Sequence, residues 1–154
     1  MAIDRLAVVE AQMLIRRPVP EVFEAFINPH ITTRFWFTKS SGQLEPGKKV
    51  RWDWEMFGVG DTLTVKEIQE NRRILIEWDG DATTVEWNFE PRGEDSTLVR
   101  ISTWGFRGDD SEVLAQSIDS KGGYTMVLAG LKAWLEYGVE LNLVRDQFPD
   151  GCLK

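Results

Sequence analysis

Residues 122–143 read GGYTMVLAGLKAWLEYGVELNL, and this stretch decides the fold. Its apolar residues recur at spacings of three and four, which places them on one face of a helix. A helix from residue 123 to about residue 143 would be roughly 30 Å long and could cover a sheet of ordinary strand length from end to end. We therefore expect the other elements to pack around one long C-terminal helix.

The residues just before this helix predict an interruption. Asp110 or Ser111 is a suitable N-cap for a short helical segment over residues 112–118. Gly122 and Gly123 follow, and two adjacent glycines are typical of a hinge or break in a helical pattern. The long helix is therefore expected to begin only at this pair.

A change of period marks the sheet. From residue 49 to residue 106 apolar and polar residues alternate, and glycine-rich or charged clusters interrupt the alternation as expected of an antiparallel meander. In the first of these strands Val50, Trp52 and Trp54 share one face, so one face of the sheet is aromatic. Together with a strand near the N-terminus, six strands are predicted, over residues 8–15, 49–55, 61–70, 73–79, 83–91 and 97–106.

Two short helices are expected between the first strand and the rest of the sheet. Pro20 suits a first helical turn, and Phe23 and Phe26 belong to an apolar stripe. Asn28-Pro29 ends this helix, and residues 30–37 could form the second. The order of elements predicts an α+β fold, an antiparallel six-stranded sheet covered by the long helix, in a single domain spanning residues 1–154.

Composition and charge exclude several classes of function. The formal net charge of −7 opposes binding to phosphate backbones, so no nucleic-acid partner is expected. No apolar run approaches the roughly 18 residues of a membrane-spanning helix, and the opening residues lack a signal-peptide core. The single cysteine, Cys152, allows neither an intrachain disulfide nor a cysteine-rich metal site, which favours a cytoplasmic location.

Four stretches of the chain carry a family resemblance. They are PVPEVFEAFINPHITTRFWF at 18–37, GKKVRWDWE at 47–55 with IEWDG at 76–80, STLVRISTWGF at 96–106, and the long-helix stretch. Together they resemble the activator-of-heat-shock-protein-ATPase homologues, a branch of the START-like (SRPBCC, birch-pollen-allergen-like) superfamily.

This resemblance implies a helix-grip fold, in which a curved sheet holds the C-terminal helix on its concave face. It also implies a cavity between sheet and helix that takes lipids, polyketides or other apolar molecules. A chaperone partner is implied less strongly, because the eukaryotic co-chaperones carry an additional N-terminal domain for which 154 residues leave no room.

Candidates for catalysis are few. His30 is the only histidine, and no serine or cysteine near it has the context of a nucleophile. Several relatives carry a histidine where Thr103 stands, so the resemblance argues against proton transfer there. An enzyme would need an inward titratable group, for which His30, Glu67 and Arg100 are the candidates. No motif predicts a cofactor, and one histidine with one cysteine cannot form the usual zinc site.

The tryptophans carry the functional argument. Seven occur in the chain, and each buried indole brings an N–H that needs a partner. Gathered between the sheet and the helix, such side chains predict a cavity for a small apolar or aromatic molecule. The residues expected to line it are Trp36, Trp52, Trp54, Phe57, Trp87, Phe89, Thr103, Tyr124, Val127, Leu131 and Trp134.

Three alternatives stay open. The aromatic side chains could form an ordinary packed core. The same cavity could serve a cyclase-like or hydratase-like enzyme. An exposed sheet face or the aromatic loops could instead bind a chaperone, or a second copy of the chain in a homodimer.

Overall fold

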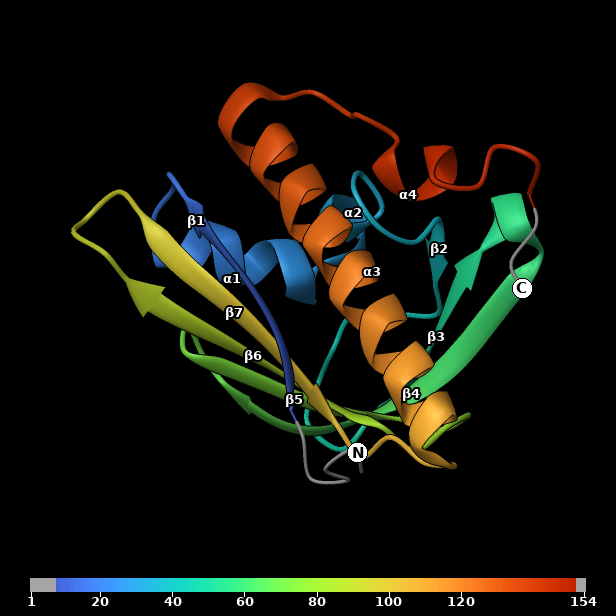
Figure 1. Cartoon of the computed structure of the whole chain (residues 1–154). Helices are drawn as coiled ribbons and strands as arrows, with labels where there is room; N and C mark the ends of the chain where they lie inside the picture. Colours follow the sequence, from blue (N-terminus) through green and yellow to red (C-terminus); the bar gives the residue numbers. More distant parts are fainter. Residues whose placement is uncertain (1–7, 152–154) are drawn as a thin grey trace.

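The alternating segments form one curved antiparallel sheet, and the long helix lies across its concave face (Figure 1). The computed structural model describes residues 8–151, so Cys152 lies outside the described residues. The order of strands in the sheet is β1-β7-β6-β5-β4-β3-β2. The strands are β1 (Val9–Ile15), β2 (Lys39–Ser40), β3 (Lys49–Trp54), β4 (Val59–Gln69), β5 (Arg73–Trp78), β6 (Thr84–Pro91) and β7 (Thr97–Trp104). The predicted α+β, helix-grip architecture is confirmed.

The sheet has seven strands where six were predicted. The additional strand, β2, is two residues long and pairs only with β3, so it forms one edge of an open sheet. Two residues are too few to show an alternation, which explains why this strand was not predicted. β4 also begins earlier than predicted, because the short 3-10 turn η1 (Glu55–Phe57) ends at Gly58, whose φ of 66° completes the reversal.

The two short helices are present as α1 (Val19–Ile27) and α2 (Pro29–Thr32). The second is shorter than the predicted segment 30–37. It is capped by the side chain of Asn28, which accepts a hydrogen bond from the backbone N–H of His30 at 3.0 Å. Beyond Thr32 the chain leaves the helix, and residues 35–37 bury their three aromatic rings in the core.

The long helix α3 (Asp110–Tyr137) is continuous, which corrects the predicted break. Asp109 caps it in a reciprocal capping box with Glu112, and the helix runs through Gly122 and Gly123. It ends before Gly138, whose left-handed φ of 66° terminates it earlier than the predicted residue 143. A helical glycine costs only about 1 kcal/mol relative to alanine, which the packing of a long helix outweighs. A last short helix, α4 (Leu143–Asp146), follows.

Polar contacts fix the C-terminal half of α3 along the edge strand β1. Lys132 Nζ donates to the carbonyl oxygen of Leu14 at 2.9 Å and to Glu136 Oε2 at 2.7 Å. The backbone N–H of Arg16 donates to the same Glu136 carboxylate at 2.8 Å. α3 therefore runs alongside β1, and its N-terminal half lies over the ends of β3, β4 and β5 (Figure 1).

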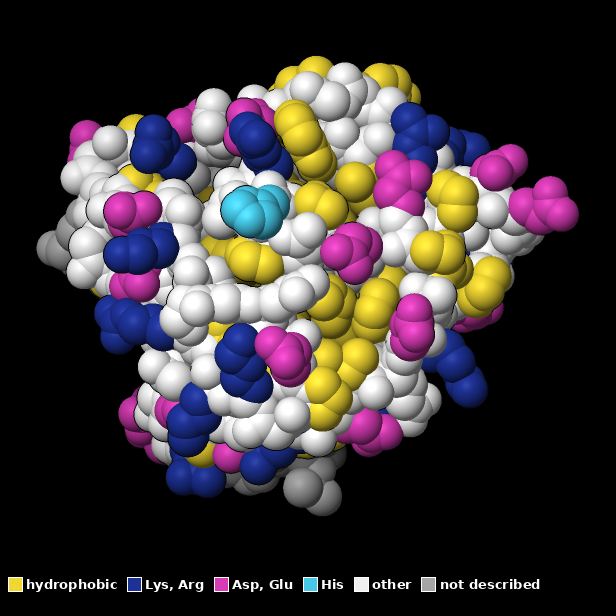
Figure 2. Space-filling view, turned by 180° about the vertical axis from the view of Figure 1, so that it is seen from behind, with side chains coloured by type: hydrophobic (Ala, Val, Ile, Leu, Met, Phe, Trp, Pro, Cys, Tyr) yellow, Lys and Arg dark blue, Asp and Glu magenta, His cyan; other side chains and the backbone are white. Residues whose placement is uncertain are grey.

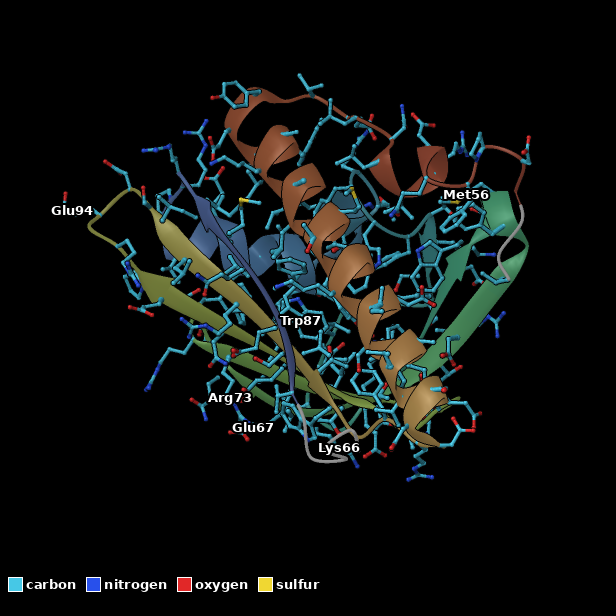
Figure 3. The ribbon with its side chains drawn as sticks, in the orientation of Figure 1. Met56, Lys66, Glu67, Arg73, Trp87 and Glu94 are labelled. Carbon is cyan, nitrogen blue, oxygen red and sulfur yellow. The ribbon has the colours of Figure 1, made fainter. Side chains whose placement is uncertain are left out.

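The core lies between the concave face and the helices. Leu128 and Leu131 of α3 are fully buried against the inward residues of the central strands, and α1 closes the other end with Val22 and Phe26. Trp87 of β6 lies between α3 and the sheet, whereas Glu67 and Arg73 project from the convex side (Figure 3). Among the described residues, no helix is long and apolar enough to cross a membrane.

Candidate functional site

Three strands place inward side chains near the N-terminal half of α3. Trp78 is the last residue of β5 and continues the inward row of Ile74 and Ile76. Trp54 is the last residue of β3. Asp61 lies on β4 directly opposite Trp52, which is buried, and alternates with the buried Leu63. The carboxylate of Asp61 therefore lies on the concave face of the sheet, on the same side as these aromatic rings.

Tyr124 of α3 completes an aromatic cluster over these strand ends. Its hydroxyl oxygen accepts a hydrogen bond from Trp78 Nε1 at 3.4 Å, and its ring centroid lies 5.9 Å from that of Trp36. The indole of Trp36 lies 4.9 Å from that of Trp52 and 6.3 Å from that of Trp54. Trp87 also contacts Trp36 and Tyr124. The aromatic cluster therefore consists of Trp36, Trp52, Trp54, Trp78, Trp87 and Tyr124.

An apolar pocket opens beside this cluster, between α3 and the segment that carries α4. Its volume is about 280 Å³. The backbone of Gly123 forms part of its wall, so no side chain fills that side. The lining residues are Trp36, Trp54, Trp78, Asp119, Ser120, Gly123, Tyr124, Val127, Val144 and Gln147.

A smaller acidic pocket adjoins the apolar pocket and has a volume of about 180 Å³. The two pockets share the side chains of Trp54, Trp78, Ser120 and Tyr124. The acidic pocket alone is lined by Asp61, Asp81, Thr83 and Thr103. A single ligand could therefore place an apolar part in one pocket and a polar part in the other.

The surroundings perturb two titratable groups in the acidic pocket. Burial raises the pKa of Tyr124 to about 12, although the hydrogen bond from Trp78 offsets part of the rise. Burial also raises the pKa of Asp61, and the negative charges of Asp81 and Asp79 raise it further. Hydrogen bonds from backbone N–H groups, that of Thr62 at 2.8 Å among them, limit this rise. The acidic pocket is thus partly desolvated and has a negative potential.

The structure brings together five of the eleven residues predicted to line a cavity. Trp36, Trp54, Tyr124 and Val127 line the apolar pocket, and Thr103 lines the acidic pocket.

The other six predicted residues lie elsewhere. Trp52, Trp87 and Leu131 are almost fully buried behind the pockets. Phe89 packs on Phe23 at the far end of the core, with ring centroids 5.4 Å apart. Phe57 packs on Phe148, and Trp134 lies under the guanidinium of Arg34 at 5.2 Å. These last three belong to other parts of the molecule.

Sequence reasoning missed Trp78, Asp61, Asp81 and Ser120. The first two could have been found, because each alternates with buried apolar residues of its own strand. Asp81 lies in the β5–β6 turn and Ser120 between the predicted short segment 112–118 and the glycine pair, so no local pattern indicated them.

The residues considered for catalysis lie away from these pockets. His30 is exposed on the face seen in Figure 2. Glu67 accepts a hydrogen bond from Arg73 Nη1 at 2.7 Å, and Arg100 Nε donates to Gln12 at 3.3 Å, both on the convex side. Within residues 8–151, no group of three His, Cys, Asp or Glu side chains could hold a metal ion.

A further groove lies on the back of the molecule, over α1. Figure 2 shows apolar side chains gathered there. Its volume is about 450 Å³, and Phe23, Ile27 and Leu44 line it, with Glu24 and Glu70 among the charged members. It is separated from the aromatic cluster by the core.

A family model described as activator of Hsp90 ATPase homolog 1-like protein matches residues 16–136. Among curated proteins, none matches the sequence significantly.

Several solved structures share the fold. A crystal structure of a protein from Staphylococcus saprophyticus is 27% identical, with a TM-score of 0.77 over 88% of this chain and 96% of that one. DynU16, a putative protein in the dynemicin biosynthetic locus, is 23% identical, with a TM-score of 0.75 over 86% of this chain and 48% of that one. An Hsp90 activator from Plasmodium falciparum is 20% identical, with a TM-score of 0.69 over 84% of this chain and 96% of that one.

Proposed function

This chain belongs to the activator of Hsp90 ATPase homolog 1-like family, and we propose that it binds a small apolar or aromatic molecule in the apolar pocket between its sheet and α3. One observation carries the proposal: a pocket walled by Trp36, Trp54, Trp78 and Tyr124 is open where the neighbouring core is closely packed.

The shape and chemistry of the pocket favour a flat ligand. A volume of about 280 Å³ lies near the lower end of the range for small-molecule sites. Aromatic walls contribute large contact areas and prefer stacked or edge-to-face partners. The hydroxyl of Tyr124 supplies a donor at the boundary with the acidic pocket, and it would orient a ligand that carries one acceptor.

A leucine at position 123 tests this proposal. A Cβ added to Gly123 would meet no heavy atom within 4 Å, so the side chain of Gly123→Leu extends into the pocket without disturbing the core. Gly122→Leu is the matched control, because Gly122 is exposed, equally unobstructed and outside the lining. Both substitutions improve helix propensity by a similar amount.

The measurement is quenching of tryptophan fluorescence by 2-naphthol, a neutral aromatic probe. We expect wild type and Gly122→Leu to bind it alike, and Gly123→Leu to bind it at least about tenfold more weakly. Equal binding by the two leucine variants, or no binding by the wild type, would contradict the proposal.

A second candidate function, a cyclase-like or hydratase-like reaction in the same site, is favoured by one observation. Asp61 is an inward carboxylate with a raised pKa that lines the same pocket as Tyr124, and such a group is suited to general acid–base catalysis. Native mass spectrometry of the purified protein would identify a retained compound. Turnover of that compound by the wild type, lost in Asp61→Asn while binding persists, would establish catalysis, and unchanged turnover in Asp61→Asn would exclude this role.

A further inference from the structure

The acidic pocket contains two carboxylates that no cation of the described chain neutralises. Neither Asp61 nor Asp81 forms an ion pair within residues 8–151, and no Lys or Arg lines the pocket. Asp79 lies in the same β5–β6 turn as Asp81 but differs from Asp61 and Asp81. It forms an ion pair with Lys49 at 3.0 Å and lies outside the pocket.

Both carboxylates are held in place by the backbone. Asp61 Oδ1 accepts from the N–H of Thr62 at 2.8 Å, and the carboxylate lies so close to Gly80 that a Cβ there would be 3.1 Å from Oδ2. Asp81 Oδ1 accepts from the N–H of Thr83 at 2.9 Å and from its hydroxyl at 2.7 Å. Two negative charges are therefore fixed in the wall of the acidic pocket before any ligand arrives, that of Asp61 half-buried and that of Asp81 exposed.

The rest of the pocket suits a positively charged nitrogen. Trp54 and Trp78 lie with their ring centroids 6.3 Å apart, and Tyr124 adjoins Trp78. Electron-rich faces of such rings attract ammonium groups, most strongly where water is excluded. The hydroxyl of Thr103 is also buried in the pocket wall, where it interacts with the hydroxyl of Tyr124 but makes no hydrogen bond of good geometry within residues 8–151. An N–H group of a ligand would supply the well-formed hydrogen bond that this oxygen lacks.

We propose that the acidic pocket binds the alkylammonium group of a ligand whose apolar part occupies the apolar pocket. The inference rests on the proposed function, since the two pockets share four side chains and would hold one molecule. Charge-assisted hydrogen bonds to the two carboxylates and contact with the indole faces would supply the preference for a cation. A volume of about 180 Å³ accommodates an amine with its first carbons.

Three probes of similar size separate charge from apolar contact: 2-phenylethylammonium, neutral 2-phenylethanol and anionic 3-phenylpropanoate. Their affinities are measured on the intact chain by chemical-shift changes at the indole N–H groups, at low and at high salt. We expect the ammonium to bind about tenfold or more tightly than the alcohol, and the carboxylate most weakly. The advantage of the cation should shrink in high salt.

Isosteric variants test whether the two carboxylates cause the preference for the ammonium over the alcohol. Asp61→Asn and Asp81→Asn should each reduce the affinity for the ammonium about tenfold and leave the affinity for the alcohol unchanged. Asp79→Asn is the matched control, since it removes an equal charge from the same turn outside the pocket, and it should retain the preference.

The outcomes distinguish this inference from the proposed function. If alcohol and ammonium bind with equal affinity, or if the preference survives both Asn variants, the ammonium site is refuted while the apolar pocket stands. If none of the probes binds, both proposals fail.

Discussion

Four glycines of α3 and its C-cap provide a sharp test of the described packing. Gly122 and Gly123 have open space where a Cβ would be, so replacing either with alanine should stabilise the protein by about 1 kcal/mol. For a chain of this size that corresponds to an increase in Tm of about 2–4 °C. Gly138 has a φ of 66°, and Gly138→Ala should destabilise the fold by about 1 kcal/mol.

Gly130 should behave in the opposite way to Gly122, although both lie within the same helix. A Cβ at Gly130 would be 3.1 Å from the Cβ of Phe35 and 3.2 Å from its carbonyl oxygen. Phe35 is buried and packs edge-on against Phe26 at 5.6 Å, so it cannot move away freely. Overpacking of this kind costs about 1–3 kcal/mol, against a gain of about 1 kcal/mol in helix propensity. Gly130→Ala should therefore be less stable than Gly122→Ala by about 1–3 kcal/mol.

Urea denaturation followed by tryptophan fluorescence measures these differences, provided that the slopes of the transitions agree among variants. If Gly130→Ala were stabilised as much as Gly122→Ala, the close approach of Phe35 to α3 would be refuted. If Gly122→Ala gave no gain, the continuity of α3 through the glycine pair would be in error, because alanine stabilises only where the backbone is helical.

Two further predictions concern the acidic pocket. A pH titration followed by phenolate absorbance should show one tyrosine that ionises only near pH 12, and this step should be absent in Tyr124→Phe. A titration that the substitution leaves unchanged would contradict the burial of the Tyr124 hydroxyl. Asp61→Asn should stabilise the free protein at neutral pH, because a carboxyl whose folded pKa is raised opposes folding when it is ionised. This gain in the free energy of unfolding should vanish as the pH falls towards 3.8, the pKa of the carboxyl in the unfolded chain. Urea unfolding at several pH values measures the gain, and a gain that does not change with pH would contradict the prediction.

The order of elements followed from the sequence because it depends on local periodicity. Alternation along residues 73–78 and 84–89 indicated both the strands and their inward faces, and spacings of three and four indicated α3. The errors came where the local signal is weakest. β2 is too short to alternate, and Gly122-Gly123 resembles a break although it lies in a helix stabilised by distant contacts of Lys132 and Glu136 with β1.

The candidate site was only partly accessible to the same reasoning. The inward direction of Asp61 follows from its alternation with Leu63 and Val65, so the sequence contained this signal. The approach of Asp81 and Thr103 to Asp61 depends on a turn and on a strand far along the chain. Convergence of this kind is set by the pairing order of the sheet, which no local pattern determines.

The sequence by itself determined that Trp52, Trp54 and Trp87 point to the concave face, because successive side chains of a strand alternate between its two faces. The same alternation applies to Trp78, although it was not used to predict that residue's direction. Only the tertiary structure decided that Trp52 and Trp87 are sealed in the core while Trp54 and Trp78 line open pockets. The physical reason is that alternation fixes the direction of a side chain, whereas the space left in front of it depends on where α3 and α4 lie over the sheet. That placement results from contacts between residues more than a hundred positions apart, such as the hydrogen bond from Lys132 to Leu14.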